Sequence, residues 1–552
     1  MRPWCGGPVV GRPKLLISVL HWKRIAIAVL SLLCVALSLY HVALVAELMP
    51  GRLAFPFDLD WMEGGQLCQA QRLLLGLPVY SELTNNYAPF AYAPLHFIVL
   101  AALGHWVPLD YLPARCLSLA CSVATIAVIC WQIKRSTPQP LRWLAVCSGV
   151  GMAAAAYFPS GAWFEIARTD SLALLLPIAA AAVAVHGPLS RRQTWAVALL
   201  CTLAIYAKQT GVCYVAFIAV FIWLTDRRRA GLFALLLVVM GGVPLVWAQW
   251  TTDGWFWQWM TLMARHPVYW LQLGKGLWLV AKFAPLVVIL PVAAWVLWRK
   301  HGLSRPSVVW LGMVVAALPG CLLPFAKQGG YLNNLLALLL LVPMVTWLLV
   351  ADCLRAVQGS VSVPVANDPR TGQQPTAAAK PVGPFAATHP QWLIGALLLA
   401  NAELLWALPQ ASKIAKYQVS AADAVAAERL HAAVAALPGE VLIPDYPFVA
   451  WRNRQPGSAT GQQPSWHSMA WQDVQLAGMD GSRAKSLAST RADWLIVSPR
   501  RRELNPPTFT GYTLQGRLLP PTGQVLIHPL RAVTQAWLWR RDAAQGPTER
   551  PN

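Results

Sequence analysis

Residues 25–48, IAIAVLSLLCVALSLYHVALVAEL, form the first of a series of long apolar runs in this chain of 552 residues. A helix needs about 20 apolar residues to cross the hydrocarbon core of a bilayer, and this run is longer. Basic residues that include Lys14, Lys23 and Arg24 precede it, and no convincing cleavage site follows it. We therefore expect an uncleaved first membrane span and not a signal peptide.

The composition of the whole chain also indicates a membrane protein. Hydrophobic residues make up 57% of the chain and charged residues only 12%, whereas a soluble chain carries about 25% charged residues. The formal net charge of +21 is explained by lysines and arginines that flank membrane spans. No motif of a nucleic-acid-binding module accompanies this charge, so we expect no nucleic-acid partner. The eleven cysteines show no spacing typical of a disulfide framework or a zinc site.

Eleven membrane spans are expected from twelve apolar runs. The runs are residues 25–48, 94–107, 113–133, 142–158, 171–186, 194–207, 210–225, 231–250, 277–298, 306–324, 334–351 and 391–408. If 94–107 is an interfacial or re-entrant helix, the basic clusters near residues 134, 191, 227 and 299 share one side with the basic N-terminus, as the positive-inside rule requires. The N-terminus (residues 1–24) is then cytoplasmic and the C-terminus lies outside.

The predicted fold class is an α-helical polytopic membrane protein with a small C-terminal extracytoplasmic α/β domain. The membrane domain spans residues 25–408 and includes a first outer loop, 49–112, with interfacial helices. Residues 352–390 are rich in Pro, Gly, Ala and Gln, and we expect a disordered cytoplasmic linker there. Residues 409–552 form the α/β domain, with a predicted helix at 421–437. Short strands are predicted at 440–445, 492–498 and 524–530.

Polar residues gather in outer segments that are far apart in the sequence. The first is DLDWMEGG (58–65), with Asp58, Asp60 and Glu63; the others are FEIARTD (164–170), KQTG (208–211) and PFAKQGGYLNN (324–334). The KQTG turn lies between two short apolar runs, which predicts a hairpin that carries Lys208 to the outer face. Charged residues beside a bilayer are costly, so this gathering indicates a functional site. The alternative interpretation of the first-loop acids is a hydrated loop end.

Carboxylates mixed with cations at a lipid–water boundary are typical of group transfer from a phosphate. A general base removes a proton from the acceptor, while cations stabilise the departing phosphate. The candidate phosphate-binding residues are Lys208, Arg168 and Lys327. Arg168 and Lys208 could instead extend toward lipid headgroups, and Asp170 could cap the helix that follows it.

The first outer loop also resembles that of a known family. The pattern D-x-D-x-x-E-G-x-x-L-x-x-A-x-R-L-L-x-G-x-P-x-Y (58–80), followed by YAPFAYAPLHFIVLAALG (87–104), is similar to the GT-C superfamily. These polytopic glycosyltransferases use polyprenyl-phosphate sugars and include protein-mannosyltransferase-like and aminoarabinose-transferase-like enzymes. Similar landmarks follow in the same order, so that the resemblance covers roughly residues 20–500. They are ARTDSLALLL (167–176), YAKQTGV (206–212), GGYLNNLLALLL (329–340), VLIPDYPFVAW (441–451) and RADWLIVS (491–498).

The resemblance implies a catalytic acid in the first outer loop and a second functional acid, Asp170, after the third span. By its spacing from Arg72, Glu63 matches the catalytic position, where many members carry Asp-Glu and this chain has Glu-Gly. Asp58, Asp60 and Glu63 therefore all remain candidates for the base. The candidate substrate-binding residues are Tyr87, Tyr92, His266, Asn333 and Asn334. The family is divided over metal dependence, and Asp58, Asp60 and Asp170 could hold Mg²⁺ or Mn²⁺.

The predicted function is a membrane glycosyltransferase of the bacterial inner membrane. It would move a sugar from a polyprenyl-phosphate-linked donor to an extracytoplasmic glycan, lipid or protein, with inversion at the anomeric carbon. One alternative is a secondary transporter or lipid-sugar flippase, although such proteins usually carry internal repeats, which this sequence does not display. A second alternative is a non-catalytic membrane scaffold that works through its C-terminal domain.

Overall fold

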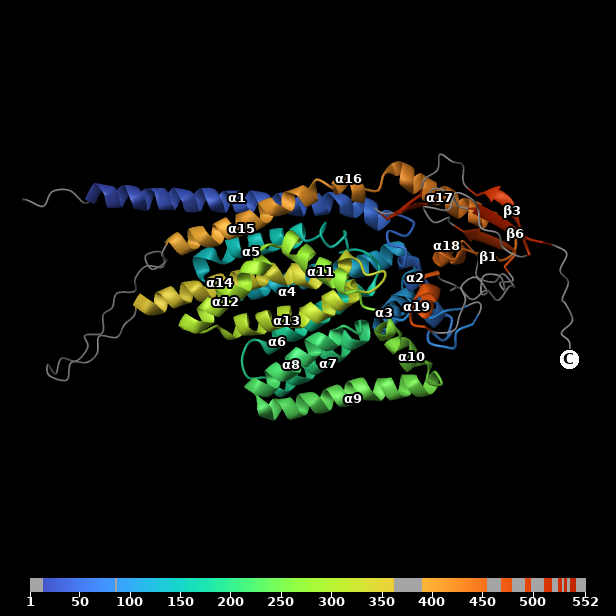
Figure 1. Cartoon of the computed structure of the whole chain (residues 1–552), viewed down its shortest axis with the longest axis horizontal. Helices are drawn as coiled ribbons and strands as arrows, with labels where there is room; N and C mark the ends of the chain where they lie inside the picture. Colours follow the sequence, from blue (N-terminus) through green and yellow to red (C-terminus); the bar gives the residue numbers. More distant parts are fainter. Residues whose placement is uncertain are drawn as a thin grey trace, which may run out of the picture.

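A bundle of helices carries a small group of strands at one end (Figure 1). The computed structural model describes residues 13–84, 87–361, 390–453, 468–478, 492–497, 511–518, 525–528, 531–533 and 537–542. The α-helices before residue 361 are α1 (Pro13–Ala54), α2 (Glu63–Leu74), α3 (Leu95–Gly104), α4 (Tyr111–Ser136), α5 (Arg142–Ala155), α6 (Thr169–Ala184), α7 (Arg191–Ala207), α8 (Gly211–Thr225), α9 (Arg227–Thr251), α10 (Trp255–Leu262), α11 (Trp270–Phe283), α12 (Leu286–His301), α13 (Arg305–Phe325) and α14 (Leu336–Val361). Those that follow are α15 (Pro390–Ala411), α16 (Ile414–Tyr417), α17 (Ala421–Ala435), α18 (Pro447–Arg452) and α19 (Ser468–Leu476), and the short 3₁₀ helices are η1 (Gln139–Leu141), η2 (Met263–Arg265) and η3 (Leu332–Leu335).

Within the described residues, six helices are long and apolar enough to cross a membrane: α1, α4, α9, α13, α14 and α15. The bent pair α11–α12 brings the number to seven if it counts as one span. Several expected spans correspond to shorter helices, such as α5, α6 and α8, so the total of eleven stays a prediction. Helix α14 lies at the centre of the bundle, because 89% of its most apolar window is buried, against 11% for the peripheral α9.

The apolar run at 277–298 does not form one continuous helix. Two helices, α11 and α12, replace it and are bent by 84°. The break falls at Pro285, which has no N–H to donate and disfavours helical geometry in the residue before it. Ala284 accordingly adopts φ −139° and ψ 73°. The break leaves the backbone N–H of Leu286, at the start of α12, without a partner in its own helix. This N–H donates instead to the Glu403 carboxylate of α15 at 3.2 Å.

Two expected boundaries also shift. Helix α1 begins at Pro13, so the predicted end of the N-terminal segment at residue 24 lies inside a helix. Helix α14 continues to Val361, so residues 352–361 of the expected linker are helical. Residues 362–389 of that linker lie outside the described part of the chain.

The small C-terminal sheet predicted from the sequence is confirmed. It consists of β1 (Val441–Leu442), β2 (Trp494–Val497), β6 (Trp537–Arg541) and β3 (Tyr512–Arg517), in that spatial order. Strands β1 and β2 are parallel, and the two other pairs are antiparallel. Strands β4 (Val525–His528) and β5 (Arg531–Val533) form a separate antiparallel pair. Helix α17 precedes the sheet and begins with a capping box between Ser420 and Asp423.

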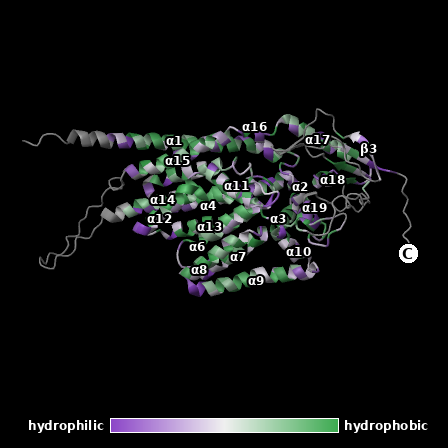
Figure 2. Ribbon diagram, viewed as in Figure 1, coloured by the Kyte–Doolittle hydropathy of each residue, from purple (hydrophilic) through white to green (hydrophobic). Residues whose placement is uncertain are grey.

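The C-terminal region packs directly on the first outer loop. Helix α18 lies against α2, and one buried cluster joins Phe57 of the loop and Trp163 to Val449 of α18 and Leu430 of α17. Figure 2 shows hydrophilic residues at the ends of α9 and α12 that lie farthest from the sheet. The basic start of α9 (Arg227–Arg229) and the basic end of α12 (Arg299, Lys300) therefore lie at the end of the bundle opposite to the C-terminal strands, while the side of the membrane that each end faces stays a prediction.

Candidate active site

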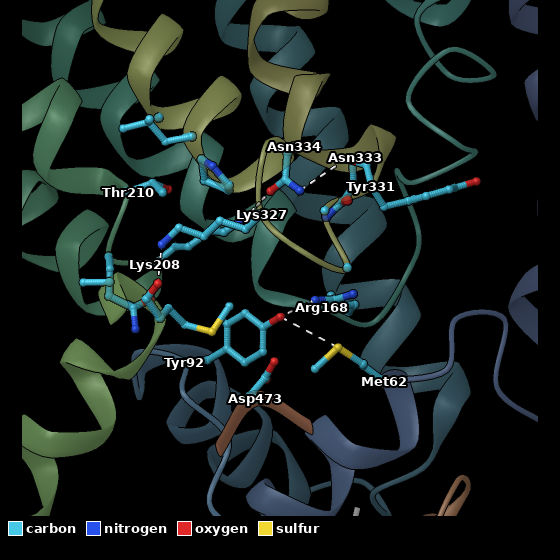
Figure 3. A pocket seen from close by; sticks show the side chains of 18 of the residues that line it. Met62, Tyr92, Arg168, Lys208, Thr210, Lys327, Tyr331, Asn333, Asn334 and Asp473 are labelled. Carbon is cyan, nitrogen blue, oxygen red and sulfur yellow. Dashed lines mark hydrogen bonds between the residues drawn. The ribbon is translucent and has the colours of Figure 1, made fainter. Parts of the chain in front are cut away.

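A cavity of about 520 Å³ lies where the helix bundle meets the first outer loop and the C-terminal region (Figure 3). Helices α8 and α13 supply an apolar wall that includes Val212, Pro319 and Leu323. The remaining walls come from the first outer loop, the segment before α6, the turn between α7 and α8, helices α10 and η2, the segment after α13 and helix α19. The charged residues that line the cavity are Asp60, Arg168, Lys208, Lys327 and Asp473.

Asp60 is the first-loop carboxylate that lines the cavity. Nη1 of Arg168 donates to its Oδ2 at 3.0 Å, and the backbone N–H of Met62 donates to the same oxygen at 3.3 Å. Burial raises the pKa of Asp60, Arg168 lowers it, and nearby Glu63 raises it again, with a result of about 6. A carboxylate with this pKa is ionised at neutral pH and can still take up a proton, which suits a general base.

Glu63 lies away from the cavity lining and is fully buried. Arg115 of α4 donates from Nε to Oε1 (3.0 Å) and from Nη2 to Oε2 (2.7 Å). The backbone N–H groups of Leu59 and Ala167 donate to the same carboxylate at 2.6 and 2.8 Å. Burial alone would raise the pKa of Glu63, but these donors outweigh it and the pKa lies below its usual value. Glu63, at the start of α2, therefore connects this helix by hydrogen bonds to α4 and to the segment before α6.

Asp58 is likewise buried and faces the interior of the first loop. It accepts hydrogen bonds from the backbone N–H of Gly64 (2.5 Å) and from the hydroxyl of Tyr111 (3.0 Å). Burial and the charge of Glu63 raise its pKa to about 8. Its partners hold the start of α2 against α4.

Asp170 lies at the start of α6 but does not cap it, because no side chain caps this helix. Its carboxylate accepts from Nζ of Lys208 (2.7 Å), Nδ2 of Asn333 (3.1 Å) and Nε1 of Trp163 (3.1 Å). Lys208 also donates to Oδ1 of Asn334 at 3.3 Å. Asp170 thus orients Lys208 and Asn333, both of which line the cavity.

The KQTG turn adopts the predicted hairpin. Helix α7 ends at Ala207 and α8 begins at Gly211, with Lys208 in extended conformation between them (φ −156°, ψ 136°). Lys208 bonds to other protein residues, which argues against a side chain directed only at lipid headgroups. Arg168 is mostly buried and also donates to the Tyr92 hydroxyl at 2.6 Å.

The other predicted residues fall into two groups. Tyr92, Lys327 and Asn334 line the cavity, and Lys327 donates a hydrogen bond to the carbonyl of Met263. Tyr87 and His266 lie outside the lining. The Tyr87 hydroxyl lies within hydrogen-bond distance of the Val79 carbonyl and of Oε1 of Gln69 within the first loop. Nε2 of His266 donates to the backbone carbonyl of Asp473 at 2.9 Å.

The expected metal ligands do not come together. Among the described residues, no group of three His, Cys, Asp or Glu side chains has an arrangement that could hold a metal ion. Asp58, Asp60 and Asp170 instead have separate partners: Tyr111, Arg168 and Lys208, respectively.

Sequence reasoning missed Asp473 and several buried arginines. Asp473 lies in SMAWQDVQL, where a single acid on a short amphipathic helix usually marks a solvated face. Arg115 lies inside an apolar run and pairs with Glu63. Arg52, at the end of α1, pairs with Glu165. An arginine inside a membrane span was the available signal, since such a residue normally has a buried partner.

Comparisons with solved structures identify the fold. The structure of ArnT from Cupriavidus metallidurans bound to undecaprenyl phosphate matches with a TM-score of 0.53 at 12% sequence identity, over 92% of this chain and 99% of that one. The apo structure of the same protein matches with a TM-score of 0.50 at 12% identity, over 96% and 100% of the two chains. No family model and no curated protein matches the sequence. The GT-C-like fold expected from the sequence is thereby confirmed.

Proposed function

We propose that this protein is a membrane glycosyltransferase that moves a sugar from a polyprenyl-phosphate-linked donor to an extracytoplasmic acceptor. The observation that carries the proposal is a single cavity that joins an apolar wall to Asp60 and three cations, Arg168, Lys208 and Lys327. The fold supports it, because ArnT with the same architecture has been solved bound to undecaprenyl phosphate.

The cavity has separate surfaces for the two halves of such a donor. The isoprenoid chain would lie on the apolar wall of α8 and α13, where Val212 and Leu323 line the cavity. The phosphate would lie within reach of Lys208 and Lys327. Lys208 is already oriented by Asp170, so its ammonium group is held in place before the donor binds, which favours stabilisation of charge that develops on the phosphate.

The reaction requires one proton transfer and one displacement at the anomeric carbon. A hydroxyl or amine of the acceptor attacks that carbon and forms the new glycosidic bond, while its proton passes to Asp60. The bond from the anomeric carbon to the phosphate oxygen breaks, and the phosphate leaves with the electron pair. Attack from the face opposite to the phosphate inverts the configuration. Arg168 lies next to Asp60 and keeps the carboxylate ionised before the proton arrives.

We place the enzyme in the bacterial inner membrane with its N-terminus in the cytoplasm. The basic ends of the helices support this orientation, since they lie at the end of the bundle opposite to the C-terminal strands and the positive-inside rule puts such ends in the cytoplasm. The cavity then opens on the extracytoplasmic side.

Sugar transfer in proteoliposomes tests the proposal. Purified protein is supplied with radiolabelled polyprenyl-phosphate sugars and a mixed envelope extract as the acceptor. We expect consumption of at least one donor, and a loss of roughly 100-fold or more in Asp60→Asn, as for removal of a general base. Glu428→Gln, an exposed acid on α17, is the matched control and should match wild type. Binding or translocation of labelled donor without consumption, in wild type and Asp60→Asn alike, would establish a transporter instead.

A further inference from the structure

Helix α19 brings a carboxylate of the C-terminal region into the cavity. Asp473 is 6% exposed and lines the cavity together with Asp60, Tyr92 and Arg168. It is the residue of the described C-terminal segments (beyond Ala411) that does so. Figure 3 shows Asp473 next to Tyr92, on the side of that ring away from Thr210 and Asn334.

Contacts of the residues around Asp473, and of its own backbone carbonyl, hold this part of α19 in place. Ala470 and Val474, three residues before it and one after it, are buried in a cluster with Trp259 of α10 and Phe90 of the first loop. His266 donates to the backbone carbonyl of Asp473. A substrate site needs residues that are held in place by such supporting contacts.

The Asp473 carboxylate has no hydrogen-bond donor among the described residues. The charge of Arg168 acts on this carboxylate, but the Arg168 guanidinium donates its hydrogen bonds to Asp60 and to Tyr92. Burial raises the pKa of Asp473 to about 7, against the lowering effect of Arg168. The residue lines the cavity, so a ligand bound there can donate hydrogen bonds to acceptor positions that the described residues leave open.

Building on the proposed function, we propose that Asp473 binds the acceptor, and that its carboxylate accepts hydrogen bonds from hydroxyl or ammonium groups next to the nucleophile. The ionised form of Asp473 repels the donor phosphate, which favours the acceptor as its partner. Lysines 208 and 327 and the apolar wall already suit the donor. The C-terminal region thereby becomes part of the active site.

Acceptor kinetics give the first test. Methyl glucoside is the hydroxyl probe and ethanolamine the ammonium probe, each titrated in proteoliposomes at a saturating level of the donor that wild type consumes. In Asp473→Asn we expect the acceptor KM to rise roughly tenfold, as for loss of a hydrogen bond to a charged group, with the donor KM unchanged. Asp473→Glu should recover part of the effect, and Glu428→Gln should resemble wild type. A larger effect for ethanolamine than for methyl glucoside indicates an ammonium acceptor, and equal effects indicate a hydroxyl acceptor.

Cysteine labelling gives a second test that needs no turnover. Asp473→Cys and Thr210→Cys are each treated with a cationic methanethiosulfonate reagent, with and without undecaprenyl phosphate, and modification at each position is read by peptide mass spectrometry. Thr210 lines the cavity next to Lys208, so undecaprenyl phosphate should protect position 210 and leave position 473 reactive.

The two ideas fail in different ways. Equal protection of positions 210 and 473 by undecaprenyl phosphate, or an unchanged acceptor KM in Asp473→Asn, overturns the role of Asp473 while leaving the transferase intact. Absence of donor consumption in wild type, together with no protection at position 210, overturns the proposed function and the role of Asp473 with it.

Discussion

Individual charged side chains in this protein are distinguished by their partners more than by their residue type. Asp60 and Glu63 are three residues apart and both buried. Asp60 forms an ion pair with Arg168, and both residues line the cavity. Glu63 instead accepts two hydrogen bonds from Arg115 and two from backbone N–H groups. The first arrangement leaves a carboxylate available to substrate, and the second leaves it fully occupied.

The pKa of Asp60 predicts how transfer depends on pH. Burial raises this pKa to about 6, and the base must be deprotonated to accept a proton. The value of kcat/KM for the donor should therefore be high above pH of about 6 and fall tenfold per pH unit well below it. The profile is measured in Asp473→Asn, where ionisation of Asp473 cannot contribute. A profile that is flat down to pH of about 4.5 would contradict Asp60 as the base.

Substitution of Glu63 should affect stability more than chemistry. Glu63→Gln leaves the buried guanidinium of Arg115 without its charge partner, and breaking a buried ion pair costs about 3–5 kcal/mol. We expect a clear fall in the thermal unfolding temperature in detergent. Asp60→Asn should lower it less, since Arg168 keeps its bond to Tyr92 and borders the cavity. Loss of activity in Glu63→Gln with an unchanged unfolding temperature would instead assign catalysis to Glu63.

At the scale of elements, the contact between α2 and α18 depends on a glycine. A Cβ on Gly64 would lie 2.9 Å from Cβ of Phe448 and 3.0 Å from Oδ1 of Asp58. The Phe448 atom is attached to the backbone of α18, so it cannot move away without moving the helix. The Glu-Gly pair therefore allows the C-terminal region to approach the first outer loop.

Gly64→Ala should accordingly destabilise the protein by about 1–3 kcal/mol, as for overpacking of a core. The expected signs are a lower unfolding temperature and faster proteolysis of the C-terminal region. Gly231→Ala is the matched control, because a Cβ at this position of α9 meets nothing within 4 Å and alanine favours a helix. Equal behaviour of the two variants would show that α18 tolerates the extra methyl group.

At the scale of the whole molecule, the two ends of the bundle differ in chemistry. Helix α1 begins at the end opposite to the C-terminal strands, and the hydrophilic ends of α9 and α12 lie at that same end. The positive-inside rule predicts that such basic ends lie in the cytoplasm, and the cavity and Asp473 are then expected to lie outside.

Reporter fusions test this orientation. Alkaline phosphatase, which needs an oxidising compartment to form its disulfides, should be active when fused to the C-terminus. A green fluorescent protein fused to the N-terminus should fluoresce from the cytoplasm. The exchanged pair of fusions serves as the control, and activity of the exchanged pair alone would reverse the orientation.

The sequence by itself determined the helical membrane architecture, the small C-terminal sheet and the GT-C-like fold. The helical architecture follows from local patterns, since apolar runs of sufficient length must form helices in lipid. The GT-C-like fold is implied by the resemblance of the first outer loop and later segments to that superfamily. The pattern also indicated that Asp170, Lys208, Asn333 and Asn334 gather, and the structure joins them by hydrogen bonds.

Only the tertiary structure decided which acids reach the cavity. Asp58, Asp60 and Glu63 lie within six positions, and their environments depend on arginines and backbone groups more than 50 residues away. Asp473 lines the cavity because α19 packs on α10 and on the first loop. A sequence pattern reports periodicity along the chain, whereas the pKa and accessibility of a carboxylate are determined by distant segments that fold against it.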